Sequence, residues 1–106
     1  MKAITIQEPW ASLILSGKKT IETRTWQTQF RGKILLTASL KPKTKLSGKA
    51  FAVANLVDIV PMTKAHEHGA QCRVYPGAFA WILKEVTPIE QFEVKGRLGL
   101  FEVKVK

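Results

Sequence analysis

Four side chains with chemistry of their own lie close together early in the chain: Lys19, Glu22, Arg24 and Trp26. If residues 20–25 form a strand, Glu22, Arg24 and Trp26 face the same side, and Lys19 stands just before them. A lysine and a glutamate can act as an acid and base pair when burial shifts their pKa values. An arginine beside a tryptophan suits a phosphate or carbonyl next to a stacked base. The stretch therefore predicts either a catalytic pair or a nucleic-acid contact.

Structural roles explain the same residue types and remain open at this stage. Glu22 and Arg24 could form an ion pair on one strand face, which contributes little to stability when exposed. Lys18 and Lys19 follow a predicted helix end, where the helix dipole stabilises cations. Trp10 falls in the apolar stripe of that helix, and a place in the core is the stronger prediction for it. Trp26 and Phe30, two aromatic residues of a predicted loop, could equally form a lid over the core.

Basic side chains are concentrated in one part of the chain. The sequence has 17 Lys and Arg against 8 Asp and Glu, a formal net charge of +9, and residues 17–49 hold nine basic residues and one acid. A one-sided field of this kind attracts polyanions, so nucleic acid, above all RNA, or a nucleoside or nucleotide is the predicted partner. A solvated, solubilising face is the alternative. The predicted contacts in this segment, besides those named above, are Arg31, Lys33, Ser39, Lys41, Lys43 and Lys45.

Cys72 is the single cysteine, so an intrachain disulfide is excluded. His66 and His68 lie nearby in sequence, but Gly69 interrupts any helix that would gather them and no fourth ligand is evident. Cys72 also lacks a recognisable partner as a nucleophile. We therefore predict an inert thiol, no metal site and no cofactor.

The elements that must position these residues follow from local patterns. A helix is predicted from Pro9, which suits a first helical position, to Gly17, a natural C-terminal cap. A second short helix is predicted over 62–68. About six strands are indicated by seven alternating or β-branched runs, of which the run over 92–94 is very short: 2–6, 20–25, 33–39, 49–60, 79–86, 92–94 and 98–105. We expect one α+β, mostly β domain over residues 1–106: a small mixed or antiparallel barrel with a helix at its mouth.

Apolar runs are short throughout. The longest, Ala78–Leu83, is far below the roughly 20 residues that a membrane-spanning helix needs. The first residues have no pattern of a secretory signal. We therefore expect no membrane association, a cytoplasmic location, and a monomer or weak dimer.

Residues 6–39, IQEPWASLILSGKKTIETRTWQTQFRGKILLTAS, resemble the N-terminal half of the ASCH domain, the activating-signal-cointegrator homology module of the PUA-like superfamily. The resemblance implies a PUA-like β-barrel with a cleft between the first helix and the barrel rim. The matched elements are Pro9-Trp10-Ala11, Leu13-Ile14, Gly17 with Lys19, Glu22-x-Arg24-x-Trp26, Arg31-Gly32 and Ala38-Ser39. Glu8 stands where many members have Gln; an acceptor-only carboxylate in a pocket would prefer a donor such as an exocyclic amine.

The resemblance implies two classes of function. One is an RNA-binding or nucleotide-binding module that uses the cleft. The other is an enzyme, because some small ASCH-like proteins are amidohydrolases of N4-acylated cytidine and others have been linked to RNA cleavage. In the amidohydrolase pattern a lysine, a threonine and a distant glutamate act together; the corresponding residues here are Lys19, Glu22 and, on weaker alignment, Glu67. Because Glu22 replaces the hydroxyl, binding is the favoured prediction. A third prediction, which follows from the basic charge, is a module that binds an acidic protein partner.

Overall fold

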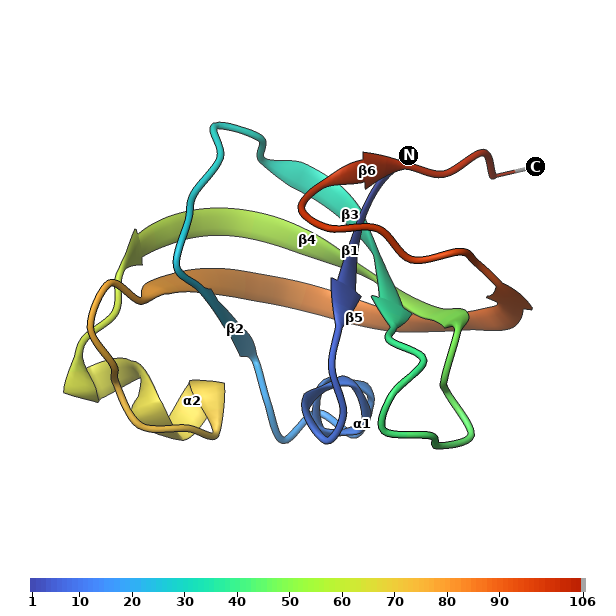
Figure 1. The fold of residues 1–106 in the computed structure, drawn as a ribbon. Helices are drawn as coiled ribbons and strands as arrows, with labels where there is room; N and C mark the ends of the chain where they lie inside the picture. The colour runs from blue at the N-terminus through green and yellow to red at the C-terminus, as the bar shows by residue number, and fades with distance from the viewer. Residues whose placement is uncertain (106) are drawn as a thin grey trace.

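The structure, a computed structural model, describes residues 1–105 of the 106-residue chain, and strands dominate it (Figure 1). None of the helices in this part of the chain is long and apolar enough to cross a membrane. The elements in order are β1 (Lys2–Ile6), α1 (Trp10–Leu15), β2 (Ile21–Arg24), β3 (Gly32–Ala38), β4 (Lys49–Pro61), the 3-10 helix η1 (Lys64–His66), α2 (Glu67–Ala70), β5 (Phe79–Glu93) and β6 (Phe101–Glu102).

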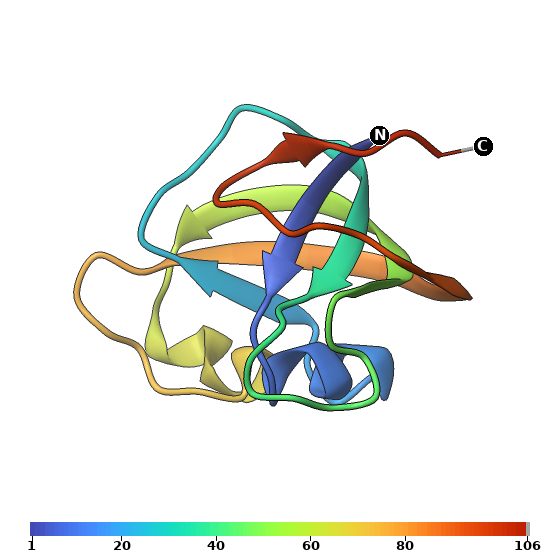
Figure 2. The same cartoon turned by 45° about the vertical axis from the view of Figure 1, so that its right-hand side comes forward.

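All six strands belong to one sheet with the order β2-β5-β4-β3-β1-β6. The β1–β3 pair is parallel and the other pairs are antiparallel. The sheet curls so that β2, at one edge, comes close to β1, near the other edge, where Arg24 donates to the carbonyl of Thr5 (Figures 1 and 2). The predicted α+β, mostly β fold is confirmed. The barrel is incomplete, however, because no backbone ladder joins β2 to β1 or β6 within residues 1–105.

The C-terminal strands differ most from the prediction. The expected strands at 79–86 and 92–94 are one strand, β5, which runs through Pro88. Its pairing with β4 shifts register on both sides of Pro88, and these bulges accommodate a residue that cannot donate a ladder hydrogen bond. The strand expected over 98–105 is reduced to β6, which pairs only with Lys2 and Ala3.

The main core fills the concave side of the curled sheet. Trp81 of β5 is buried there together with Phe51 of β4 and with Ala11 and Ile14 of α1. A smaller cluster packs Ala70 of α2 beneath the start of β5. The two helices therefore stand at the same end of the sheet, and the segment leading into β2 passes between them (Figure 1).

Candidate functional site

A cleft of about 1620 Å³ opens at the mouth of the curled sheet. It lies between β1, β2, the start of α1 and two loops, residues 39–48 and 94–99. We call Lys19, Glu22 and Arg24 the floor triad: Lys19 and Glu22 are the buried charged residues that line the cleft, and Arg24 is bonded to Glu22. Four basic residues on the surrounding strand end and loops form what we call the rim cations: Lys41, Lys49, Lys95 and Arg97.

The floor triad is a continuous network of charges. Lys19 is 1% exposed, and its Nζ donates to the carbonyl of Ala70 and lies 3.7 Å from Glu22 Oε1. Glu22 Oε2 accepts from Arg24 Nε at 3.1 Å and lies 2.9 Å from Arg24 Nη2. Glu22 pairs across the sheet with the buried Trp81, so the triad faces the interior side of the sheet. The predicted convergence of these three residues is thus present.

Burial sets the protonation behaviour of Lys19. Loss of hydration lowers the pKa of its ammonium group, and the nearby Arg24 lowers it further. The opposite influences of Glu22 and Cys72 offset this only in part. A buried lysine with a lowered pKa beside a carboxylate can exchange protons or hold a polar ligand group.

Arg24 also closes the seam that the backbone leaves open. Its Nη2 donates to the carbonyl of Thr5 on β1 at 2.6 Å. That carbonyl is free for the contact because its neighbour on β1, Ile6, turns its own carbonyl to Ser39 on the opposite side. Within residues 1–105 the remaining guanidinium nitrogen, Nη1, has no hydrogen-bond partner. Arg24 is therefore fixed in place and keeps one donor group for a ligand.

Glu8 does not line the cleft, contrary to the pocket role considered for it. Its Oε1 accepts from the backbone N–H of Ser12 at 2.7 Å, and its Oε2 accepts from the hydroxyls of Ser12 and Thr44, each at 2.6 Å. Burial raises the pKa of Glu8, but these hydrogen bonds outweigh it and the net pKa is lowered. The carboxylate fastens loop 39–48 to α1 and has no free oxygen for a ligand amine.

The two tryptophans of the motif have different surroundings. Trp10 packs against the core, as predicted, but also lines the cleft. Trp26 lies beyond the end of β2, so the strand parity that would direct it to the cleft does not reach it. Its ring meets Trp81 edge to face, with centroids 4.9 Å apart, and its carbonyl accepts from Trp81 Nε1 at 3.3 Å. Trp26 covers the core rather than the cleft.

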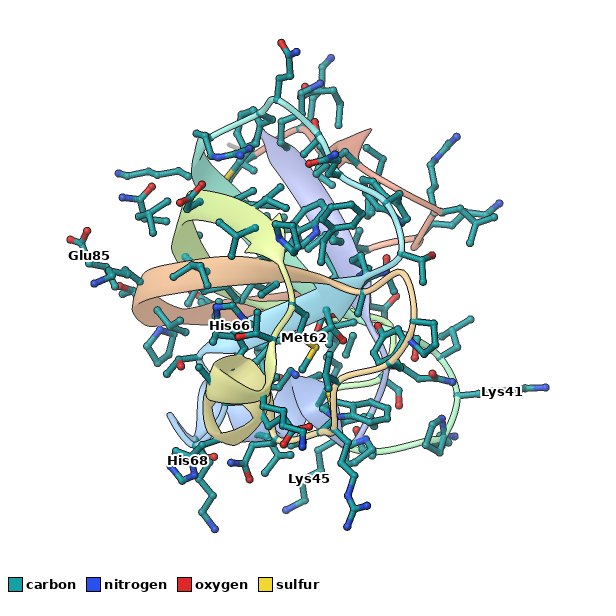
Figure 3. The ribbon with its side chains drawn as sticks, turned by 90° about the vertical axis from the view of Figure 1, so that its left-hand side faces the viewer. Lys41, Lys45, Met62, His66, His68 and Glu85 are labelled. Carbon is teal, nitrogen blue, oxygen red and sulfur yellow. The ribbon has the colours of Figure 1, made fainter. Side chains whose placement is uncertain are left out.

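Loop 39–48 brings only some of its predicted contacts to the cleft. Ser39 and Lys41 line it, and the Ser39 hydroxyl donates to the Lys41 carbonyl at 2.7 Å. Lys43 and Lys45 are exposed on the same loop but are not part of the lining. Figure 3 shows Lys41 and Lys45 extending away from the ribbon in different directions.

Three other predicted basic contacts lie elsewhere. Arg31 and Lys33 stand at the opposite end of β3 from the cleft, about 16 Å away along the strand. Arg31 lies 3.8 Å from Asp58 and donates to two carbonyls of its own loop. Lys18 is exposed after α1 and does not line the cleft. The basic segment 17–49 is therefore not one continuous surface.

The residues around α2 have local roles. Glu67, the weak candidate for a distant catalytic carboxylate, lies outside the cleft lining and accepts from the N–H of Val74 at 2.8 Å. His66 caps its own turn, and His68 points to another side of the short helical segment (Figure 3). Cys72 does line the cleft. Residues 1–105 contain no group of three or more His, Cys, Asp or Glu that could hold a metal ion.

Sequence reasoning missed the far wall of the cleft. Lys95 and Arg97 fall between the strands predicted over 92–94 and 98–105, and Tyr75 lies before the strand predicted over 79–86; none of the three was predicted as a site residue. Tyr75 donates its hydroxyl to Thr23 on β2 at 2.9 Å, which brings its ring to the cleft. The Lys-Gly-Arg triplet is the one sequence signal that could have identified the second basic loop.

A comparison of the sequence with protein families agrees with this geometry. The sequence profile of the ASCH domain matches residues 4–93. The chain belongs to the ASCH-domain family. The resemblance first carried by the motif around Glu22 and Arg24 is thereby confirmed, and it extends over most of this ASCH domain.

Solved structures similar to this ASCH domain support the same fold. The crystal structure of ASCH from Zymomonas mobilis superposes with a TM-score of 0.75 at 19% identity, covering 97% of this chain and 87% of that one. A single-residue variant of the Zymomonas protein superposes with a TM-score of 0.70, also at 19% identity, over 97% of this chain and 89% of that one.

Among characterised proteins, human activating signal cointegrator 1 is 40% identical over 38 residues. The match covers 36% of this chain and only 6% of the human protein. This ASCH domain therefore corresponds to a small part of that much longer relative.

Proposed function

We propose that this ASCH domain binds single-stranded RNA in the cleft at the mouth of the curled sheet. RNA binding has been suggested for the family. The observation that supports it most directly in this chain is the set of rim cations, which surround a cleft that also has aromatic walls, Trp10 and Tyr75. Cations that follow the backbone, together with rings on which bases stack, are the usual means of binding single strands.

The rim cations are available for phosphate. Within residues 1–105, none of Lys41, Lys49, Lys95 and Arg97 has a carboxylate within 4.0 Å, and Glu93 is the one acidic residue on the rim. Arg31, outside the cleft, is instead close to Asp58. When protein cations neutralise phosphates, the counterions condensed on the nucleic acid are released, and this release supplies much of the binding free energy.

The walls favour unpaired nucleotides over a duplex. Besides the two aromatic rings, the lining contains Leu40 and Leu98, which are 73% and 100% exposed. Apolar side chains left in water beside cations can cover the faces of bases, which are accessible only when the bases are not stacked inside a helix. The cleft thus suits a looped or single-stranded segment.

The test is fluorescence anisotropy of a labelled RNA decamer across a salt series. One triple variant, Lys41→Gln, Lys95→Gln and Arg97→Gln, removes rim cations; its matched control, Lys18→Gln, Lys33→Gln and Arg31→Gln, removes the same charge outside the cleft. The slope of log K against log salt is negative, and each lost phosphate contact makes it less steep by about 0.7 for a single strand. The slope of the rim variant should therefore be less steep than that of the wild type by about 2. The control should keep nearly the wild-type slope.

Two results would overturn this proposal. Absence of RNA binding at low salt would exclude the cleft as an RNA site. Equal losses in the two triple variants would indicate a response to net charge alone. All six substitutions replace exposed side chains, so we expect both variants to fold. Circular dichroism of each variant checks this.

A second candidate function, hydrolysis of an N4-acylated cytidine, is favoured by the buried Lys19–Glu22 pair. Glu22 would take a proton from water, the resulting hydroxide would attack the acyl carbonyl, and the proton would pass to the departing amine as the C–N bond breaks. Lys19 would stabilise the charge on the carbonyl oxygen. Arg24 opposes this chemistry, because its guanidinium is bonded to the Glu22 Oε2 that would otherwise be open to the attacking water.

Turnover of N4-acetylcytidine by the wild type and by Lys19→Ala distinguishes the two functions. We expect no turnover by either protein. Turnover that disappears in Lys19→Ala while RNA affinity persists would make the domain an amidohydrolase. The integrity of the labelled RNA in the same samples tests the RNA-cleaving alternative.

A further inference from the structure

We propose that the cleft receives one unpaired base and reads a keto oxygen on it, with Arg24 as the specificity-determining residue. The inference rests on the proposed RNA binding and adds the chemistry of the preferred base. The oxygen meant is O4 of uracil or O6 of guanine and hypoxanthine. Cytosine and adenine carry an amino group at that position, and the O2 of cytosine is present on uracil as well.

The first step is the state of the Arg24 guanidinium. Its Nε and Nη2 are engaged by Glu22 and by the carbonyl of Thr5. Its Nη1 has no partner in the described residues, and the side chain is 22% exposed where it lines the cleft. A guanidinium donates and never accepts, so the ligand group that meets Nη1 must be an acceptor.

The second step is that donor groups outnumber acceptors at the floor. Glu22 is the one carboxylate there, and its two oxygens face the cations of Lys19 and Arg24. Lys19 is itself a donor-only group. An amino group placed against Arg24 Nη1 would set donor against donor, and its hydration would be lost without replacement there.

The third step is why a base, rather than a phosphate, belongs at the floor. Glu22 lies between the two floor cations and would repel an anion brought against them. The rim cations have no such carboxylate within ion-pair distance in residues 1–105, so phosphates are better placed on the rim. A neutral carbonyl oxygen can approach Arg24 without this repulsion, while Trp10 and Tyr75 flank the base.

The experiment compares two matched pairs of labelled RNA decamers at one salt concentration and pH 7.5. Oligo(U) and oligo(C) differ chiefly at position 4 of the pyrimidine, and oligo(I) and oligo(A) at position 6 of the purine. The keto member of each pair should bind at least about tenfold more tightly, the scale expected for a hydrogen bond to a charged donor. In Arg24→Gln the ratio within each pair should fall to about one, because an amide can serve either group.

Arg31→Gln is the control, since Arg31 lies outside the cleft and should keep the wild-type ratios. Equal affinities within both pairs, with binding still dependent on salt, would overturn the keto preference and leave RNA binding standing. A preference that persists in a folded Arg24→Gln would overturn the role of Arg24. Failure of all four RNAs to bind would overturn both proposals. The wild-type pairs decide the preference even if Arg24→Gln, which loses the Thr5 contact, does not fold.

Discussion

The two buried glutamates near the cleft differ in function because their partners differ. Glu8 accepts three hydrogen bonds, from a backbone amide and two hydroxyls, and is saturated by neutral groups. Glu22 is instead shared by Lys19 and Arg24. The first arrangement is structural and holds a loop, while the second holds charged groups at the floor of the cleft. At the scale of single residues, neighbours rather than residue type decide the role.

Glu8→Gln should reduce stability in a pH-dependent way. The pKa of Glu8 is lowered in the folded protein, so its ionisation stabilises the fold above its unfolded pKa near 4.5, and this contribution is lost as the pH falls through the folded value. Urea unfolding at pH 7 should therefore show a loss of about 1–2 kcal/mol in Glu8→Gln. The difference from wild type should shrink at acidic pH. A constant difference would contradict the hydrogen-bonded carboxylate.

Lys19 should shift stability in the same direction, in a more alkaline range of pH. Its pKa is lowered by folding, so the unfolded chain binds a proton more readily between the folded value and 10.5, and stability gains from deprotonation as the pH rises through this window. Compared with Lys19→Met, wild type should thus become relatively more stable at higher pH. Unfolding in urea at several pH values measures the difference, and Lys33→Met, at an exposed position, should show no such trend.

The two tryptophans should separate stability from binding. Trp26→Ala removes a half-buried ring packed on Trp81 and should cost about 2–3 kcal/mol of stability, with RNA affinity of the folded protein unchanged. Trp10→Ala should lower RNA affinity by about 1–3 kcal/mol, the range for one stacked base. Thermal melts and anisotropy on both variants test this. A loss of RNA affinity in folded Trp26→Ala would show that Trp26 contributes to RNA binding after all.

At the scale of elements, the four-residue helix α2 supports the cleft floor. The Gly69 carbonyl accepts from the N–H of Thr20 at 2.8 Å, and the carbonyl of Ala70 accepts from Lys19. The fit is close: a Cβ on Gly69 would stand 2.8 Å from Ile21 Cδ1 and 3.0 Å from Thr20 Oγ1. A short helix with few contacts of its own thereby positions both the start of β2 and the buried lysine.

Gly69→Val should push α2 away from β2. The substitution overpacks this contact, and we expect a loss of about 1–3 kcal/mol in denaturant unfolding, accompanied by weaker RNA binding as the floor shifts. Ala65→Val, at an exposed position of η1, is the control for adding the same side chain nearby. Equal stability of Gly69→Val and wild type would show that α2 does not support β2 in this way.

At the scale of the whole molecule, the edge of the curled sheet depends on a side chain. β2 has four residues, and its one strand partner in the described part of the chain is β5. Arg24 bridges from β2 to the carbonyl of Thr5 on β1. The same arginine thus holds the seam and lines the cleft, which couples the integrity of the fold to the site.

Arg24→Gln should therefore open the seam selectively. Amide hydrogen exchange should become faster in β2 and at the C-terminal end of β1, while the central strand β4 keeps its protection because its two neighbours are unchanged. Arg31→Gln, outside the seam, should leave the exchange pattern as in wild type. Faster exchange spread evenly over all strands would indicate general destabilisation instead.

The sequence by itself determined the elements whose signals are local. Alternation predicted β1 and β3, Pro9 and Gly17 delimited the first helix, and the Glu22-x-Arg24 motif with Lys19 indicated both the family and the floor of the cleft. These features depend on residues within a turn or a strand of each other, where side-chain period and capping chemistry decide the outcome.

Only the tertiary structure decided which distant groups meet. The curl of the sheet brings loop 94–99 across from loop 39–48 and adds Lys95 and Arg97 to the cleft, while β3 carries Arg31 and Lys33 to its opposite end. Glu8 accepts a hydrogen bond from Thr44, which is 36 residues away in sequence, and so does not line the cleft. Such contacts arise from long-range strand pairing and sheet curvature, which no local period encodes.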